Sequence, residues 1–154
     1  MKRKSLVVIA LASLLLPLQV AFAADERGTA KEAEAMVKRA IEHLRKVGKE
    51  KAFADFTAKK VPFFDRDLYV TVTTLEGVSQ AHGQNPKMVG KNMIDFKDVD
   101  GKLYFQERME LAKTKGKFWQ DFKFTDPLTK TVLPKSMYCE REGDLVVCTG
   151  IYKH

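Results

Sequence analysis

Two cysteines placed around a tight turn constrain the C-terminal part of this chain more than any other feature. Cys139 and Cys148 lie in the segment SMYCEREGDLVVCTGIY, in which two runs of strand-forming residues flank Gly143-Asp144. A two-residue loop at Gly143-Asp144 places the cysteines directly opposite each other, at a non-hydrogen-bonded pair of an antiparallel hairpin, where Cα atoms approach most closely. We therefore predict a structural cross-strand disulfide, with two free buried thiols as the alternative.

The first 23 residues have the three parts of a secretory signal peptide. Lys2, Arg3 and Lys4 precede the apolar run Leu6–Leu16, and Ala21-Phe22-Ala23 supplies the small residues that signal peptidase requires. The alternative is a membrane anchor, but the apolar run is short for a bilayer, which needs about 20 residues. We expect cleavage after Ala23, a single domain at 24–154, and a periplasmic or secreted location in a bacterium, where a disulfide is stable.

The charge of the chain depends on this cleavage. The whole sequence has a formal net charge of +7, but the exported part has 24 basic and 20 acidic side chains, a surplus of only +4. Such a surplus favours small anionic molecules or a membrane surface, and it gives no indication of nucleic acid as a partner.

The segment 25–60 is predicted to be helical, because apolar residues recur in it at three- and four-residue spacing. Gly48 interrupts the pattern, and Lys49–Ala58 forms a second helix that ends before Pro62. The expected apolar stripe consists of Ala33, Met36, Val37, Ala40, Ile41, Leu44 and Val47.

The next segment reads as a hairpin, with strands at Leu68–Leu75 and Val78–His82 around Glu76-Gly77. In this register Thr71 is opposite His82 and Thr73 is opposite Gln80. Alternation then predicts two faces of different character. One carries Tyr69, Thr71, Thr73, Gln80 and His82, and the other carries Val70, Val72, Thr74, Ser79 and Ala81.

A long connection at 83–101, typical of functional loops, separates this hairpin from the remaining elements. These are a helix at Phe105–Lys115 and three strands at Lys117–Thr125, Val132–Glu142 and Leu145–Lys153. Hairpin-joined strands give a five-stranded antiparallel sheet, so the predicted class is α+β. The long N-terminal helix is expected on one face, and a cavity between the other face and the connection.

The order of these elements and a set of short sequence motifs resemble those of a single Cache domain, a PAS-like extracellular sensor of bacterial receptors. The resemblance covers about residues 30–153. Its motifs are Asp67-Leu68-Tyr69-Val70, Ala81-His82, Val89-Gly90-Lys91-Asn92, Asp95, Lys97-Asp98, Asp100-Gly101-Lys102, Gly116 with Trp119, Pro134-Lys135-Ser136 with Tyr138, and Gly150-Ile151-Tyr152. Gly83 and Lys130 depart from the family pattern near the expected pocket. Because the sequence stops at His154, we expect a free-standing module.

The resemblance implies a site for a small organic acid between the sheet and the connection. A buried carboxylate needs a cation or several hydrogen-bond donors. The candidate ligand-binding residues are Tyr69, Thr71, His82, Trp119, Lys135 and Tyr138. Period-two alternation puts Lys135 and Tyr138 on opposite faces of one strand. Of the two, we favour Tyr138, because it lies in the regular part of the strand.

The predicted function is therefore a sensor or binding module for a short-chain organic acid anion, with a membrane receptor or kinase as its signalling or chemotaxis partner. The alternative is a protein-interaction subunit that dimerises through the 25–60 helix. An enzyme is not expected, because the only histidines are His43, His82 and His154 and no catalytic constellation is present. No cofactor or metal is expected either, since Asp95, Asp98 and Asp100 lack the spacing of a calcium loop.

Overall fold

The computed structural model describes residues 27–153. The predicted export signal and its cleavage site after Ala23 lie outside the described residues. The elements, in chain order, are α1 Ala30–Val47, α2 Lys49–Thr57, β1 Phe64–Asp65, β2 Leu68–Tyr69, β3 Thr71–Thr74, β4 Ser79–His82, the 3-10 helix η1 Pro86–Met88, α3 Tyr104–Thr114, β5 Lys117–Thr125, β6 Val132–Glu142 and β7 Leu145–Tyr152.

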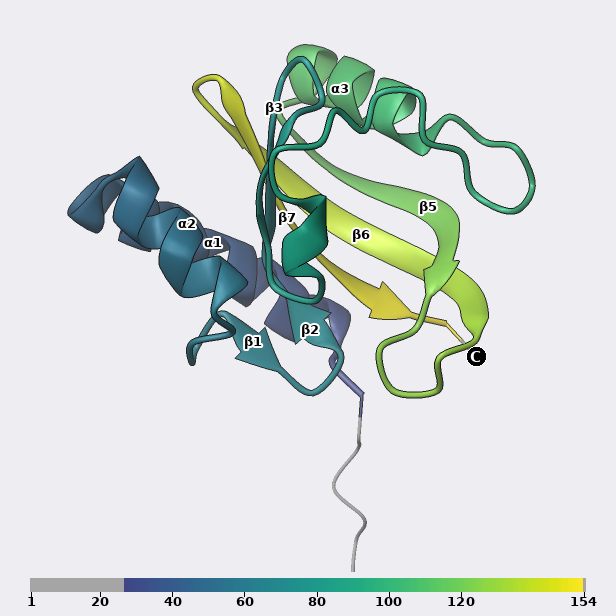
Figure 1. Ribbon diagram of the computed structural model, residues 1–154, viewed down its shortest axis with the longest axis horizontal. Coiled ribbons are helices and arrows are strands. Elements are labelled where there is room, and N and C mark those ends of the chain that lie inside the picture. Colours follow the sequence, from purple (N-terminus) through teal and green to yellow (C-terminus); the bar gives the residue numbers. More distant parts are fainter. Residues whose placement is uncertain (1–26, 154) are drawn as a thin grey trace, which may run out of the picture.

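The fold is α+β, as predicted, and its centre is a five-stranded antiparallel sheet in the order β4-β3-β7-β6-β5. Helices α1 and α2 lie against one face of this sheet, and α3 lies against the other (Figure 1). The short strands β1 and β2 pair separately. No helix within residues 27–153 is long and apolar enough to cross a membrane.

Helix α1 forms where the apolar periodicity predicts it. Thr29 and Glu32 make a reciprocal capping box at its start, and Gly48, with φ of 85°, ends it and opens α2. The buried face of α1 consists of Ala33, Met36, Val37, Ala40, Ile41 and Leu44, which pack against the sheet. The apolar stripe of α1 is therefore covered by the sheet of the same chain.

The C-terminal hairpin has the predicted register. Cys139 pairs with Cys148 across β6 and β7, their Cα atoms are 4.2 Å apart, and the disulfide is formed. Both residues are buried on the face that α3 covers. Strands β5 and β6 also have the predicted bounds.

The first hairpin departs from the prediction in two ways. The predicted strand Leu68–Leu75 is divided at Val70 into β2, which pairs with β1, and β3, which pairs with β4, and the register of β3 and β4 shifts at one point. Thr71 lies opposite His82 as predicted, but a bulge after Val72 pairs Thr73 with Ser79 and not with Gln80. The extra residue turns Ser79 toward the cavity side of the sheet, which strict alternation does not anticipate.

Removing the disulfide will lower stability without changing the fold. In the double variant Cys139→Ala/Cys148→Ala, the free energy of unfolding in urea should fall by about 2.5–3 kcal/mol, because a closed loop of this length no longer restricts the unfolded chain. The variant should also be indifferent to reductant, whereas the wild-type protein loses stability when reduced under denaturing conditions. Equal stability of the double variant and the oxidised wild-type protein would contradict the structural role.

Candidate functional site

A small cavity lies between the α3-covered face of the sheet and α3 itself. Its volume is about 30 Å³, far below what a drug-sized ligand needs. The strands, α3 and the long connection all contribute to its wall, which consists of Tyr69, Thr71, Thr73, Ser79, His82, Met93, Tyr104, Phe105, Arg108, Phe122, Phe124, Lys135 and Met137.

Four of the six predicted site residues are brought together here, namely Tyr69, Thr71, His82 and Lys135. The other two, Trp119 and Tyr138, lie on the α1 face of the sheet, and we correct their expected placement in the pocket. Tyr138 donates to Glu140 at 2.8 Å, and Trp119 donates to Glu34 of α1 at 3.3 Å.

The alternation argument is correct for β6, but the choice between its two residues is wrong. Lys135 and Tyr138 point to opposite faces, and it is Lys135 that reaches the cavity. The regularity of a strand at Tyr138 does not tell which face is covered by α1 and which by α3, so this argument could not settle the choice.

Lys135 is the central residue of the site. Its side chain is 1% exposed, and Nζ donates to the hydroxyls of Tyr69 at 2.7 Å and Tyr152 at 3.2 Å. Nζ also lies over the rings of Tyr69, Tyr152 and Phe124, at 4.2–5.5 Å from their centroids. Within residues 27–153 no carboxylate pairs with this ammonium. Burial, aided by the charge of Arg108, lowers the pKa of Lys135 to about 7.

Gly150 makes room for the lysine stem. A Cβ on Gly150 would lie 2.7 Å from Cε of Lys135 and 3.0 Å from the carbonyl oxygen of Ser136. The Gly150-Ile151-Tyr152 motif therefore contributes twice to the lysine site: Gly150 leaves room for the side chain, and the Tyr152 hydroxyl accepts from the ammonium.

Arg108 supplies a second buried cation, which the sequence reading did not identify. It is 2% exposed, and its Nε donates to Gln120 at 3.0 Å, while Nη2 is buried without a partner. Burial lowers its pKa to about 10. One signal was available: Arg108 stands in the apolar stripe of α3 with Phe105, Met109 and Ala112, where a surface arginine does not belong.

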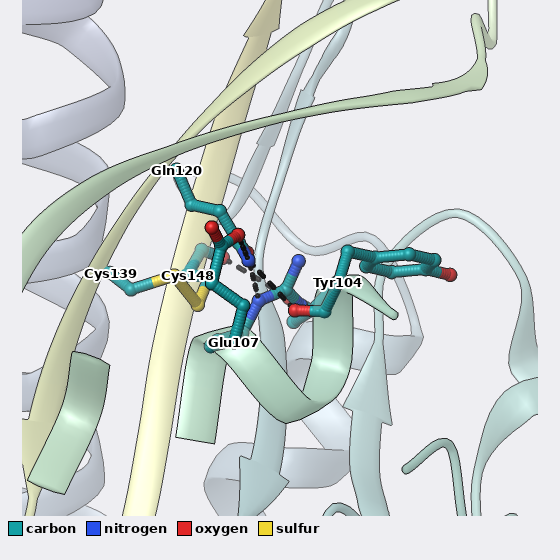
Figure 2. The surroundings of a disulfide bond; sticks show 7 residues. Tyr104, Glu107, Gln120, Cys139 and Cys148 are labelled. Atoms are coloured by element: carbon teal, nitrogen blue, oxygen red, sulfur yellow. Dashed lines mark hydrogen bonds between the residues drawn. A yellow bond between two sulfur atoms is a disulfide. The ribbon is translucent and has the colours of Figure 1, made fainter. Parts of the chain in front are cut away.

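Gln120 fixes the orientation of Arg108. Its side-chain amide donates to the carbonyl of Tyr104 at 2.7 Å and to Glu107, so its oxygen faces the guanidinium. Figure 2 shows these bonds between Gln120, Tyr104 and Glu107 beside the disulfide of Cys139 and Cys148. The arginine is thereby held between α3 and β5.

His82 is neutral and can donate into the cavity. Its Nδ1 accepts the backbone N–H groups of Gln84 at 3.3 Å and Asn85 at 3.0 Å, so the proton is on Nε2. Burial, together with the charge of Lys135, lowers the pKa of His82 to about 4. The ring stacks on Tyr69 with the centroids 5.4 Å apart.

The wall therefore combines two cations and several donors with no acid. No Asp or Glu is among the described lining residues, and Oγ1 of Thr73 is buried without a partner, as is Nη2 of Arg108. A small anion is the kind of molecule that could accept hydrogen bonds from such a wall. A metal would not suit this wall, and residues 27–153 contain no group of three or more His, Cys, Asp or Glu side chains arranged to hold one.

Comparison with known proteins places the chain in a family. The model of a family described as Single Cache domain 2 matches residues 13–154. No curated protein matches the sequence.

Three solved structures share the fold. A methyl-accepting chemotaxis protein from Vibrio parahaemolyticus RIMD 2210633 is 23% identical with a TM-score of 0.67, over 79% of this chain and 86% of that chain. A periplasmic sensor domain of a chemotaxis protein is 21% identical with a TM-score of 0.64, over 80% and 90%. A Cache chemosensory domain described for its carboxylic acid recognition is 20% identical with a TM-score of 0.69, over 80% and 92%.

The buried lysine makes stability depend on pH in a defined direction. Its pKa is about 7 in the folded protein and near 10.5 in the unfolded chain, so the unfolded chain binds more protons between these values. The free energy of unfolding should therefore gain a rising contribution from pH 7 to about 10.5.

Lys135→Met tests this by removing the charge while keeping most of the side-chain volume. We expect the variant to be more stable at pH 7 by about 1–4 kcal/mol, as when buried ionic groups are replaced by apolar ones, and to lose the rise at alkaline pH. Urea unfolding at pH 7 and pH 10 measures both. Lys113→Met, at an exposed position of α3, is the control and should keep the wild-type pH profile.

Proposed function

The chain belongs to the Single Cache domain 2 family, and from that premise we propose that it is a periplasmic sensor module that binds a short-chain organic acid anion. The family is one of sensor domains and not of enzymes. The observation that carries the proposal is the pair of buried cations, Lys135 and Arg108, in a cavity whose described wall has no acid.

The ligand's carboxylate would complete the hydrogen bonding of this wall. It would accept from Lys135 and from the free Nη2 of Arg108, with the Nε2 proton of His82 and the hydroxyls of Tyr69 and Thr73 as further donors. Charged hydrogen bonds of this kind compensate the removal of the carboxylate from water.

The volume of the cavity and its apolar side chains limit what the ligand can carry besides its carboxylate. A volume of about 30 Å³ admits only a small molecule, after adjustment of the wall, and excludes an aromatic acid. The described wall has no acid to pair with the ammonium group of an amino acid, so a simple carboxylate fits it better. The side chains that would face the rest of the ligand are apolar, namely Met93, Phe122, Phe124 and Met137. The carboxylic acid recognition described for one similar Cache domain agrees with this class of ligand.

Signalling would require a partner. A membrane receptor or histidine kinase is the partner we propose, in keeping with the sensor character of the family. The alternative, a subunit that dimerises through the 25–60 helix, has less support, because the apolar stripe of α1 is buried against the sheet.

A thermal-unfolding screen against acetate, propionate, lactate, pyruvate, amino acids and nucleobases tests the ligand class. A ligand at a hundred times its Kd adds about 2.7 kcal/mol, which should raise the Tm of a domain of this size by about 10 °C. We expect shifts with the short carboxylates only. Lys135→Met should abolish them. Tyr138→Phe, on the opposite face of the sheet, should leave the shifts unchanged. Loss of the shifts in this variant would indicate that the ligand binds on the α1 face, where Trp119 and Tyr138 lie.

The affinity should also fall as the pH rises above neutrality. An anion binds the protonated form of Lys135, whose pKa in the free protein is about 7. The Kd for acetate is then nearly constant below pH 6 and rises up to about tenfold per pH unit above pH 7. Isothermal titration calorimetry between pH 5.5 and 9 measures this, and a pH-independent Kd would show that Lys135 does not pair with the ligand.

A further inference from the structure

Directly before α1, Arg27 joins two carboxylates that are buried at the end of the sheet. Asp67 and Asp126 are both 0% exposed. The guanidinium donates to both oxygens of Asp126, at 2.8 and 2.7 Å, and to Asp67 at 3.4 Å. The backbone N–H of Gly28 adds a bond of 2.6 Å to Asp67.

Asp126 is ionised in this arrangement. Burial alone would raise its pKa, but the bonds from Arg27 and from the hydroxyl and backbone N–H of Thr129 hold the pKa of this carboxyl well below its usual range. The pKa of Arg27 is raised by the same contact. Arg27 is therefore the positive charge that compensates two acids in a dry environment.

Tyr152 connects this cluster with the proposed ligand site. The guanidinium carbon of Arg27 lies 6.0 Å from the centroid of its ring, and Nζ of Lys135 lies 4.7 Å from the same centroid, so the two charges are less than about 11 Å apart. The hydroxyl of Tyr152 donates to the carbonyl of Thr125, the residue before Asp126, and accepts from Lys135.

The acids behind Tyr152 act on Lys135 through space. Both carboxylates favour its protonated form, and in a buried region such an interaction is weakly screened by salt. The charged and titratable groups that line the cavity with Lys135 or contact it are Tyr69, His82, Tyr104, Arg108 and Tyr152, and beyond Tyr152 lie Arg27, Asp67 and Asp126. A second cavity that Lys135 also lines has charged groups of both signs in its wall, namely Asp98, Asp100, Lys102, Asp121, Lys123 and Lys153. Without Arg27, two uncompensated carboxylates would compete with an external anion for the same ammonium.

We propose that Arg27 is a positioning residue of the ligand site: by pairing with Asp67 and Asp126 it leaves the charge of Lys135 available to the ligand. The segment preceding the first helix thus belongs to the binding machinery, although it does not line the cavity. This inference rests on the proposed function, because it concerns the affinity for an anion at Lys135.

Two single substitutions that break the same ion pair have opposite electrostatic effects. Arg27→Gln makes the cluster more negative, and Asp126→Asn makes it more positive. The measurement is the Kd for acetate and propionate from pH 5.5 to 9 by calorimetry on the purified protein, with circular dichroism to verify folding. The midpoint is the pH above which affinity declines.

For Arg27→Gln we expect an affinity at pH 6 that is about three- to tenfold weaker and a midpoint about 0.5–1 pH unit higher. For Asp126→Asn we expect a tighter Kd at pH 6 and a lower midpoint. Arg27→Lys, which keeps the charge, should retain the wild-type midpoint. The double variant Arg27→Gln/Asp126→Asn, which restores the net charge of the cluster, should return the midpoint to its wild-type position.

Other results would overturn the inference. If both single variants shift the midpoint in the same direction, loosening of the segment and hydration of Lys135 are responsible and the charge is not. If neither variant changes affinity or midpoint while the wild-type protein binds the acids, Arg27 has no part in the site. Absence of binding in the wild-type protein would instead refute the proposed function. If Arg27→Gln does not fold, the other two variants still test the proposal. Asp126→Asn should lower the midpoint, and the double variant should keep the wild-type midpoint.

Discussion

A buried ammonium without a carboxylate beside it is the constraint on which much of this structure depends. Lys135 can stay buried only because two phenol oxygens accept from it and three aromatic rings surround it. Those contacts require β2, β5, β6 and β7 in their observed registers, and the lysine stem requires the missing side chain of Gly150. The arrangement costs stability, and an anion in the cavity would recover part of that cost.

The two faces of the sheet differ in their packing and in their buried polar groups. The α1 face is closed by a regular apolar stripe. On it Tyr138 donates to Glu140, while Oγ1 of Thr149, a neutral hydroxyl, is buried without a partner. The α3 face combines an apolar layer around the disulfide with buried cations whose hydrogen bonding is incomplete. Incomplete hydrogen bonding of a buried charge is expensive. Within residues 27–153 the buried lysine and arginine, Lys135 and Arg108, both lie on the α3 face, which is why we propose this face for the ligand.

Local patterns predicted most of the fold. The helix stripe, the hairpin around Gly143-Asp144, the disulfide and the bounds of β5 and β6 all follow from periodicity and turn chemistry, which act between near neighbours in the chain. The residues of the site were harder to predict from the sequence. The bulge that brings in Ser79 depends on the partner strand, and Trp119 and Tyr138 were misplaced because alternation does not say what covers each face. Arg108 and the pairing of Arg27 with Asp67 and Asp126 depend on tertiary contacts.

The near-complete burial of Lys135 also has a consequence for timing. A carboxylate can reach a group that is 1% exposed only when the surrounding side chains or the connection between β4 and α3 move aside. Association should then proceed well below the diffusion limit, since only a minor open conformation is competent to admit the anion. The same opening step would limit escape. The lifetime of the occupied state would then depend on the packing around the cavity as well as on the ion pair within it. That lifetime limits how rapid a change in concentration a sensor of this design can follow.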